Sequence, residues 1–313
     1  MNVRDWRTLS SAQVEPLYQS EIARWDAVLH WDTRANWRLV EAARAAGTLP
    51  GVVVHDASGA VQGWAFYLLH RDALQVGALV CRSPAATGAV LGAMLDSAEA
   101  GTASSITLFT FADAPALTGE LRQGGFAISH YRYLQRSLAA EAIVAQDARP
   151  ALPNVVRAGR ATESRRWQPG DLVPVAKLLA RAYGAPDASR PFVRRGRSED
   201  WIEYVEQLVT TRGCGVFLPE ATVIGESLEG VDAVVLATRL GAGTAHLAQV
   251  AVEPAAQRSG RGRRILSAAL TNLRSADYVR ATLLVSAANG AANGLYEQLG
   301  FVETGRFIAA VRD

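Results

Sequence analysis

VEPAAQRSGRGRR, residues 252–264, follows a run of apolar residues and precedes a segment with helical periodicity. A basic segment that contains glycines fits three structures here: a nucleic-acid patch, a solvated turn, or a cradle for phosphate groups. Glycines let backbone N–H groups converge on an anion because no Cβ blocks the approach. The start of a helix adds unpaired N–H donors and the positive end of the helix dipole. We therefore interpret QRSGRG, residues 257–262, as a pyrophosphate cradle, with a turn that carries solvated arginines as the alternative.

The composition limits the class of protein. The chain has 313 residues, 49% of them hydrophobic, which suffices for one large core or two ordinary ones. Its net charge is only +2, so we expect no general attraction for nucleic acid. The two cysteines, Cys81 and Cys214, are too few for a disulfide framework or a zinc site. Without a signal peptide or a long apolar run, the sequence predicts a cytoplasmic protein that binds neither membrane nor metal.

The chain reads as two copies of one α/β unit. From Thr107, TLFTFADAPALTGELRQGGF passes from a strand through a helix to Phe126, and from Thr282, TLLVSAANGAANGLYEQLGF does the same to Phe301. Both stretches span the same distance along the chain, which indicates a duplication. We expect each copy to form a mixed, largely antiparallel twisted sheet flanked by helices. The predicted domains are 1–138 and 155–313, joined by a linker at 139–154.

The second copy resembles the GCN5-related N-acetyltransferases (the GNAT superfamily). Motif A of that family reads Gln/Arg-x-x-Gly-x-Gly/Ala after a strand; here the strand ends VAVEP (250–254) and the loop is QRSGRG. The next motif of the family also matches, in NGAANGLYEQLGF (289–301). The resemblance covers residues 155–313. It implies an acyl-CoA co-substrate, with acetyl-CoA as the expected donor.

The resemblance also implies roles for particular residues. The strand that ends at Val252 should splay from its neighbour, which frees main-chain groups of Val250 and Val252 for the pantetheine arm. The loop amides should hold the pyrophosphate, the loop arginines should pair with the CoA phosphates, and Asn289 should contact the cofactor arm. Tyr296 should protonate the departing thiolate; a half-buried structural tyrosine is the alternative. The predicted cofactor-binding residues are Val250, Ala251, Val252, Gln257, Arg258, Ser259, Gly260, Arg261, Gly262, Arg263 and Asn289.

The acceptor amine must lose a proton, because an ammonium group has no lone pair. The histone-acetylating branch of the family has a glutamate eleven positions before the motif-A glutamine, and the corresponding residue here is His246. Strand alternation predicts that His246 shares a face with Val250 and Val252. An imidazole with a pKa near 6.5 would serve as the base. The alternatives are a purely structural His246, with Glu253, Gln249 or ordered water taking the proton.

The first copy lacks the corresponding chemical groups. In SPAATG (83–88), Pro84 is followed by a glycine after four residues, whereas Pro254 is followed by Gly262 after eight. Leucine occupies the position that corresponds to Tyr296, and alanine the position that corresponds to Asn289. We therefore expect the first copy to keep the fold and to lose the cofactor.

The sequence thus predicts an N-acyltransferase that acts on a small-molecule amine by direct attack in a ternary complex, since no cysteine lies in either motif. Two alternatives remain. A non-catalytic acyl-CoA sensor or scaffold would need the same cradle, and an aminoacyl-tRNA-dependent transferase would generally lack it. The arginine-rich segment RPFVRRGR (190–197) would recognise an anionic acceptor or form a solvated loop.

Overall fold

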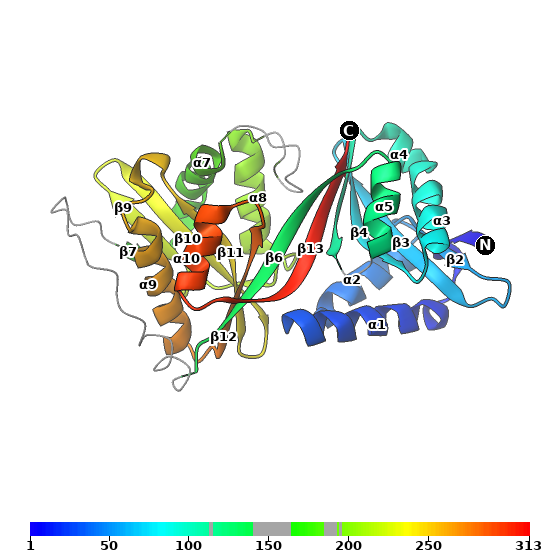
Figure 1. Ribbon diagram of the computed structural model, residues 1–313, viewed down its shortest axis with the longest axis horizontal. Coiled ribbons are helices and arrows are strands. Elements are labelled where there is room, and N and C mark those ends of the chain that lie inside the picture. Colours follow the sequence, from blue (N-terminus) through cyan, green and yellow to red (C-terminus); the bar gives the residue numbers. More distant parts are fainter. Residues whose placement is uncertain (113–114, 140–163, 185–192, 194–195) are drawn as a thin grey trace. The chain divides into compact units, whose positions relative to one another are not determined.

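The computed structural model describes residues 1–112, 115–139, 164–184, 193 and 196–313 (Figure 1). Contacts divide the chain into two compact units. The described residues of unit 1 are 1–112, 115–132, 193 and 305–313, and those of unit 2 are 133–139, 164–184 and 196–304. The predicted linker lies almost entirely outside the described residues. Among those residues, no helix is both long enough and apolar enough to cross a bilayer.

Unit 1 is a mixed sheet with helices against it. The strands lie in the order β1-β2-β3-β4-β5-β13, in which β4 and β5 pair in parallel and the other neighbours pair antiparallel. The elements of the first half are β1 (Asn2–Asp5), η1 (Trp6–Thr8), α1 (Ser11–Leu29), α2 (Arg34–Ala45), β2 (Gly51–His55), β3 (Val61–His70), β4 (Ala73–Cys81), α3 (Pro84–Leu95), α4 (Ala98–Thr102), β5 (Ser105–Phe111), α5 (Pro115–Gln123) and β6 (Ala127–Ser137).

Unit 2 repeats this plan. Its strands lie in the order β6-β12-β11-β10-β9-β7, with β8 paired to β10. The elements of the second half are β7 (Ser164–Arg166), η2 (Pro169–Asp171), α7 (Leu172–Tyr183), α8 (Ser198–Thr210), β8 (Val216–Phe217), β9 (Val223–Ser227), β10 (Gly230–Gly241), β11 (Thr244–Val252), η3 (Pro254–Ala256), α9 (Arg261–Ser275), β12 (Arg280–Ser286), α10 (Gly290–Gln298) and β13 (Val302–Arg312).

The register of the strands confirms the duplication. β4 and β11 each have nine residues, and each pairs in parallel through its first four residues only. Each also carries a β-bulge at its fifth residue, Gly77 in β4 and Ala248 in β11, where the antiparallel register with the preceding strand shifts by one. The two units therefore share their irregularities as well as their element order.

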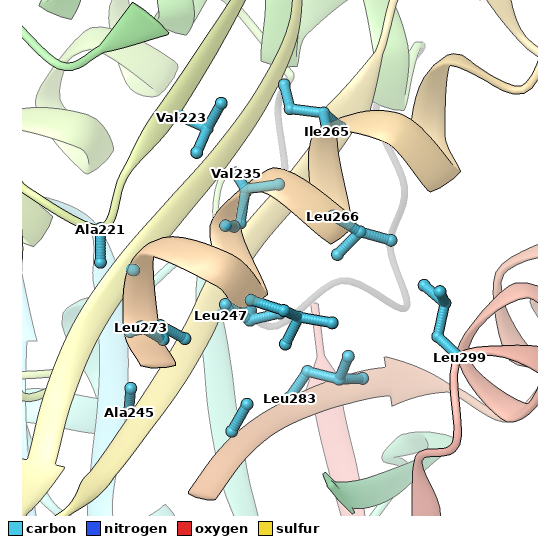
Figure 2. Close-up of a cluster of buried hydrophobic side chains, with 14 of the residues drawn as sticks. Ala221, Val223, Val235, Ala245, Leu247, Ile265, Leu266, Leu273, Leu283 and Leu299 are labelled. Atoms are coloured by element: carbon cyan, nitrogen blue, oxygen red, sulfur yellow. The ribbon is translucent and has the colours of Figure 1, made fainter. Parts of the chain in front are cut away.

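The core of unit 2 lies between α9 and one face of the sheet. Apolar residues of α9 recur at helical spacing, so that Ile265, Leu266 and Leu273 face the strands. Figure 2 shows these side chains over Val235 of β10 and Leu247 of β11. This packing fixes the start of α9, and with it the predicted cradle, against the end of β11.

The two halves exchange their last strands. β6 begins in unit 1 and ends in unit 2, where Leu134 and Leu138 join the core. β13 begins in unit 2 and ends in unit 1, where it pairs with β5 and buries Ile308 and Ala310. Each sheet is thus completed by a strand from the other half of the sequence.

Candidate active site

The centre of the candidate site is the gap between β11 and β12. The two strands pair from Thr244 with Arg280 to Leu247 with Leu283, and the pairing stops there. Both strands continue beyond that point, β11 to Val252 and β12 to Ser286. The bulge at Ala248 lies where the strands begin to diverge. The predicted splay is therefore confirmed.

The main-chain groups of Val250 and Val252 face this gap. The N–H of Glu253 donates to Asp232 O over 2.7 Å, so residue 253 bonds towards β10. In an antiparallel pair the N–H and C=O of every second residue bond to the partner strand. With Val252 opposite Ala233, the next residue before Glu253 that bonds to β10 is Ala251. The N–H and C=O of Val250 and Val252 therefore point to the β12 side, and Val252 O accepts a hydrogen bond from Gln257 Nε2 at 3.2 Å.

The loop after β11 presents an array of backbone donors. Arg258 and Gly260 have left-handed φ angles of 58° and 82°, and α9 begins at Arg261. Within the described part of the chain, the loop has five N–H groups without a hydrogen-bond acceptor, those of Arg258, Ser259, Gly260, Gly262 and Arg263. Unpartnered amides at the positive end of a helix fit the two charges of a pyrophosphate.

The side chain of Arg261 does not belong to this cradle. It is 3% exposed, and its Nε lies 3.1 Å from Asp232 Oδ1. Its Nη2 also donates to Glu226 O over 3.2 Å. The expectation that this guanidinium pairs with a CoA phosphate is wrong, because the first turn of α9 directs the side chain to the buried carboxylate at the start of β10. Arg261 instead fastens α9 to the sheet.

The other arginines of the loop differ in whether their side chains have a polar partner. Arg263 donates to Gln298 Oε1 of α10. Arg258 and Arg264 are exposed, and neither has a polar partner among the residues that the structure describes. Arg264 was not among the predicted residues. Its Nη1 lies 3.5 Å from the point where a Cβ would stand if residue 260 carried a side chain. It follows Gly260 by four residues, one helical turn, and this spacing in the sequence would have identified it.

Three of the predicted cofactor residues also shape the site from within. Ser259 Oγ donates to Ala256 O over 2.6 Å, and the side chain of Gln257 joins the loop to β11 as described above. Asn289 is exposed and caps α10, where its Oδ1 accepts from Ala292 N at 3.1 Å. The sequence reasoning missed Asn293, which is buried and donates to Ser286 O and Asn289 O. These contacts hold the end of β12 to the start of α10.

Tyr296 lies on α10 and is 7% exposed. Its ring packs edge-on against Phe301 with centroids 5.9 Å apart. Burial raises the pKa of its hydroxyl, and the nearby Tyr183 raises it further. In the described structure this hydroxyl has no hydrogen-bond partner. Tyr296 therefore keeps its proton at neutral pH and has it available for a bound group.

His246 differs from expectation in two respects. Because of the bulge at Ala248, the residue opposite His246 on β10 is Thr238, and the one opposite Val250 is Val235. His246 therefore shares a face with Gln249 and not with Val250 and Val252, as alternation had predicted. Burial also lowers the pKa of His246 to about 4, well below the expected 6.5.

The hydrogen bonds of His246 define its neutral tautomer. Its Nδ1 lies 3.0 Å from Thr282 Oγ1, and that hydroxyl donates its single proton to Ala245 O at 3.1 Å. We therefore place the imidazole proton on Nδ1, which leaves Nε2 as the acceptor. The ring also stacks on Tyr133 at 6.1 Å.

A polar cluster that the sequence reasoning only touched lies on the same face as His246. Tyr183 Oη donates to Gln249 Oε1 over 2.6 Å, and Gln249 Nε2 donates to Tyr204 Oη over 2.6 Å. Trp201 stacks on Tyr183. Glu253, another predicted candidate base, instead pairs with Arg181 at 2.7 Å. One signal was present in the sequence: Gln249 is the one polar residue between Leu247 and Val252.

Two further predictions concern the surroundings of the site. In the parts of the chain described here, no group of three or more His, Cys, Asp or Glu side chains is placed to hold a metal. Most of the arginine-rich segment 190–197 lies outside the described residues, so its role stays a prediction.

Comparisons with known proteins agree with this geometry. Residues 228–309 match the family model described as the acetyltransferase (GNAT) domain. A search of curated protein sequences found no match.

Solved structures show the same fold. A GCN5-related N-acetyltransferase from Sphaerobacter thermophilus is similar with a TM-score of 0.57 and 18% identity, over 84% of this chain and 80% of that one. A tandem GNAT protein from the clavulanic acid biosynthesis pathway is similar with a TM-score of 0.53 and 17% identity, over 84% and 82%. A glucosamine N-acetyltransferase region of a fungal multi-domain protein has a TM-score of 0.60 and 13% identity, over 99% and 38%. At these identities the likeness is one of fold. Residues 228–309 thus match an acetyltransferase (GNAT) domain model, and the chain shares the fold of these solved acetyltransferases.

Proposed function

We propose that the protein is an acyl-CoA-dependent N-acyltransferase that transfers an acetyl group to the amine of a small molecule. One observation carries this proposal: the gap between β11 and β12 leads directly to a loop with five unpartnered backbone N–H groups. A sensor or scaffold protein would need the same binding features, so the catalytic part of the proposal depends on Tyr296.

The residues at the gap suit acetyl-CoA. The loop amides from Arg258 to Arg263 would hold the pyrophosphate, and Arg258 and Arg264 would approach the phosphates from solvent. The main-chain groups of Val250 and Val252 would bond the pantetheine arm. When bound, acetyl-CoA supplies an activated thioester.

Tyr296 would act as the general acid. A thiolate with a pKa near 8–9 leaves more readily when a proton reaches its sulfur. The raised pKa of Tyr296 keeps its hydroxyl protonated over the whole physiological range, so the donor is always present. The hydroxyl needs no other contact to be broken before it donates.

We assign His246 a positioning role. A side chain with a pKa of about 4 is too weak a base to take up the proton of an ammonium group efficiently. Its bond to Thr282 instead joins β11 to β12 one residue before the pairing ends at Leu247 and Leu283. The acceptor amine then loses its proton to water, and the rate should follow the pKa of the acceptor itself.

Direct transfer agrees with the state of the thiols. Burial raises the pKa of both Cys81 and Cys214 to about 11, so both are neutral at pH 7. A nucleophilic cysteine needs a lowered pKa. This supports attack by the amine on the thioester without an acyl-enzyme.

The test is a thiol-release screen with acetyl-CoA and longer acyl-CoAs against amino acids, polyamines, aminoglycosides and peptides. With the acceptor found, Tyr296→Phe should lower kcat by roughly 100-fold or more and leave the affinity for acetyl-CoA unchanged. Tyr278→Phe, a half-buried tyrosine packed on the same core, is the matched control. Tight binding of acetyl-CoA with no transfer to any amine, and no effect of Tyr296→Phe, would support the sensor instead.

A further inference from the structure

Unit 1 contains a pocket at the place that corresponds to the gap of unit 2. β4 and β5 pair from Ala73 with Ser105 to Val76 with Leu108, and then diverge. A pocket of about 240 Å³ lies between the diverging ends, bordered by β4, β5, α3, α5 and Arg24 of α1. This volume is below the roughly 300–1,000 Å³ of pockets that hold drug-sized ligands. The pocket therefore suits a small molecule.

The pocket has no phosphate cradle beside it. Two residues separate β4 from α3, and the helix begins at Pro84, which has no N–H. Ser83 Oγ accepts a hydrogen bond from Ala86 N at 3.2 Å, and Thr87 Oγ1 donates to Ser83 O over 3.1 Å. The N-terminus of α3 is thus capped by its own residues. A ligand of this pocket does not depend on a pyrophosphate for binding.

The sheet supplies main-chain groups to the pocket. The N–H of Arg82 donates to Gln62 O at 2.8 Å, so residue 82 bonds towards β3. By the same alternation as in β11, the N–H and C=O of Leu79 and Cys81 face the pocket side. These main-chain groups therefore offer hydrogen bonds within a wall that is otherwise partly apolar.

Arg24 of α1 places a positive charge at one side of the pocket. Among the described residues that line the pocket, Arg24 is the ionised side chain, since burial keeps the thiol of Cys81 neutral at pH 7. The Arg24 guanidinium carbon lies 4.1 Å from the ring centroid of Phe111, and its Nη1 lies 3.7 Å from Glu21 Oε1. A guanidinium has five N–H donors, so it can serve Glu21 and a ligand carboxylate together.

We propose that unit 1 binds a small monocarboxylic acid, with its apolar body between the ends of β4 and β5 and its carboxylate at Arg24. The aliphatic side chains and the Phe111 ring would contact the body, and the hydroxyls of Thr87 and Thr110 border it. This site is separate from the gap of unit 2. The proposal does not rest on the acyltransferase activity.

The first experiment titrates the full-length protein with straight-chain acids from propanoate to octanoate, and with the corresponding neutral amides, by calorimetry. We expect saturable binding of one acid per chain, with the matched amide weaker by about tenfold or more because it lacks the charge-assisted bonds. Arg24→Gln should abolish this preference. Equal binding of acid and amide, or no saturable binding of any acid, would overturn the proposal.

A second experiment remains informative if Arg24→Gln fails to fold. In Cys214→Ser protein, Cys81 is the remaining thiol, and it lines the pocket. The bound acid should slow alkylation of Cys81 severalfold, and saturating acetyl-CoA should not. Protection by acetyl-CoA with displacement of the acid would show that the pocket takes the coenzyme, and would overturn the proposal. Neither experiment measures acyl transfer, so a failure of the carboxylic-acid proposal leaves the acyltransferase proposal intact.

Discussion

A carboxylate placed at Gly260 tests the amide cradle. A Cβ at this position would have one heavy atom within 4 Å, Arg264 Nη1 at 3.5 Å, so Gly260→Glu meets no steric barrier. It acts through charge and through the left-handed φ of 82°. A carboxylate roughly 4 Å from one phosphate charge costs about 4 kcal/mol at an effective dielectric constant near 20. A helix pair with Arg264 would offset about 0.5 kcal/mol of this.

The affinity for CoA should therefore fall by several hundredfold, since each 1.4 kcal/mol is a factor of ten. Gly260→Ala separates the conformational part, because a side chain in the left-handed region costs roughly 1–2 kcal/mol. Gly170→Glu is the charge control, because Gly170 is exposed, has open space around its Cβ position, and lies in η2. Calorimetric titration with CoA, alongside thermal melts of each variant, measures the effect. Equal affinity of Gly260→Glu and Gly170→Glu would refute the cradle.

Three further predictions concern neighbouring side chains. The unfolded chain protonates His246 near pH 6.5 but the native chain only near pH 4. As the pH is lowered from 6.5 to 4, the free energy of unfolding should therefore fall by about 1.4 kcal/mol per pH unit. Urea unfolding at pH 5 and 7.5 should show a weaker pH dependence for His246→Asn than for the unmodified protein. Arg261→Ala leaves Asp232 buried without its partner and should cost roughly 3–5 kcal/mol of stability. Arg258→Ala should leave the melting temperature unchanged and weaken the binding of CoA by at most about fivefold. Gln249→Leu leaves the hydroxyls of Tyr183 and Tyr204 without this hydrogen-bond partner and should cost about 1–3 kcal/mol of stability, as urea unfolding would show.

The order of the elements followed from sequence because it depends on local periodicity. Hydrophobic spacing predicted the strand and helix from Thr107 to Phe126 and those from Thr282 to Phe301, and the equal lengths of these stretches revealed the repeat. The splay of β11 followed from the resemblance carried by the QRSGRG loop. These features depend on segments of a few residues to about twenty residues.

The errors have non-local causes. Alternation along β11 failed at Ala248, because a bulge depends on the partner strand and shifts every later residue to the other face. Arg261 was assigned to phosphate because its buried partner, Asp232, lies 29 positions earlier. The pKa of His246 depends on burial beneath several elements, which no single segment encodes. Pairings between distant strands, including the exchange of β6 and β13, have no local signature either.

The exchange of last strands bears on how the chain folds during synthesis. The edge of β5 that receives β13 must wait until residues from Gly305 onward emerge. At about 5–20 residues per second, the chain from Phe111 to Gly305 takes roughly 10–40 s to synthesise. Throughout that interval the nascent sheet exposes unpaired backbone groups, which can pair with another chain. The first half of this protein thus becomes a finished domain only after the second half has been translated, so aggregation during translation, and not stability afterwards, should limit its yield.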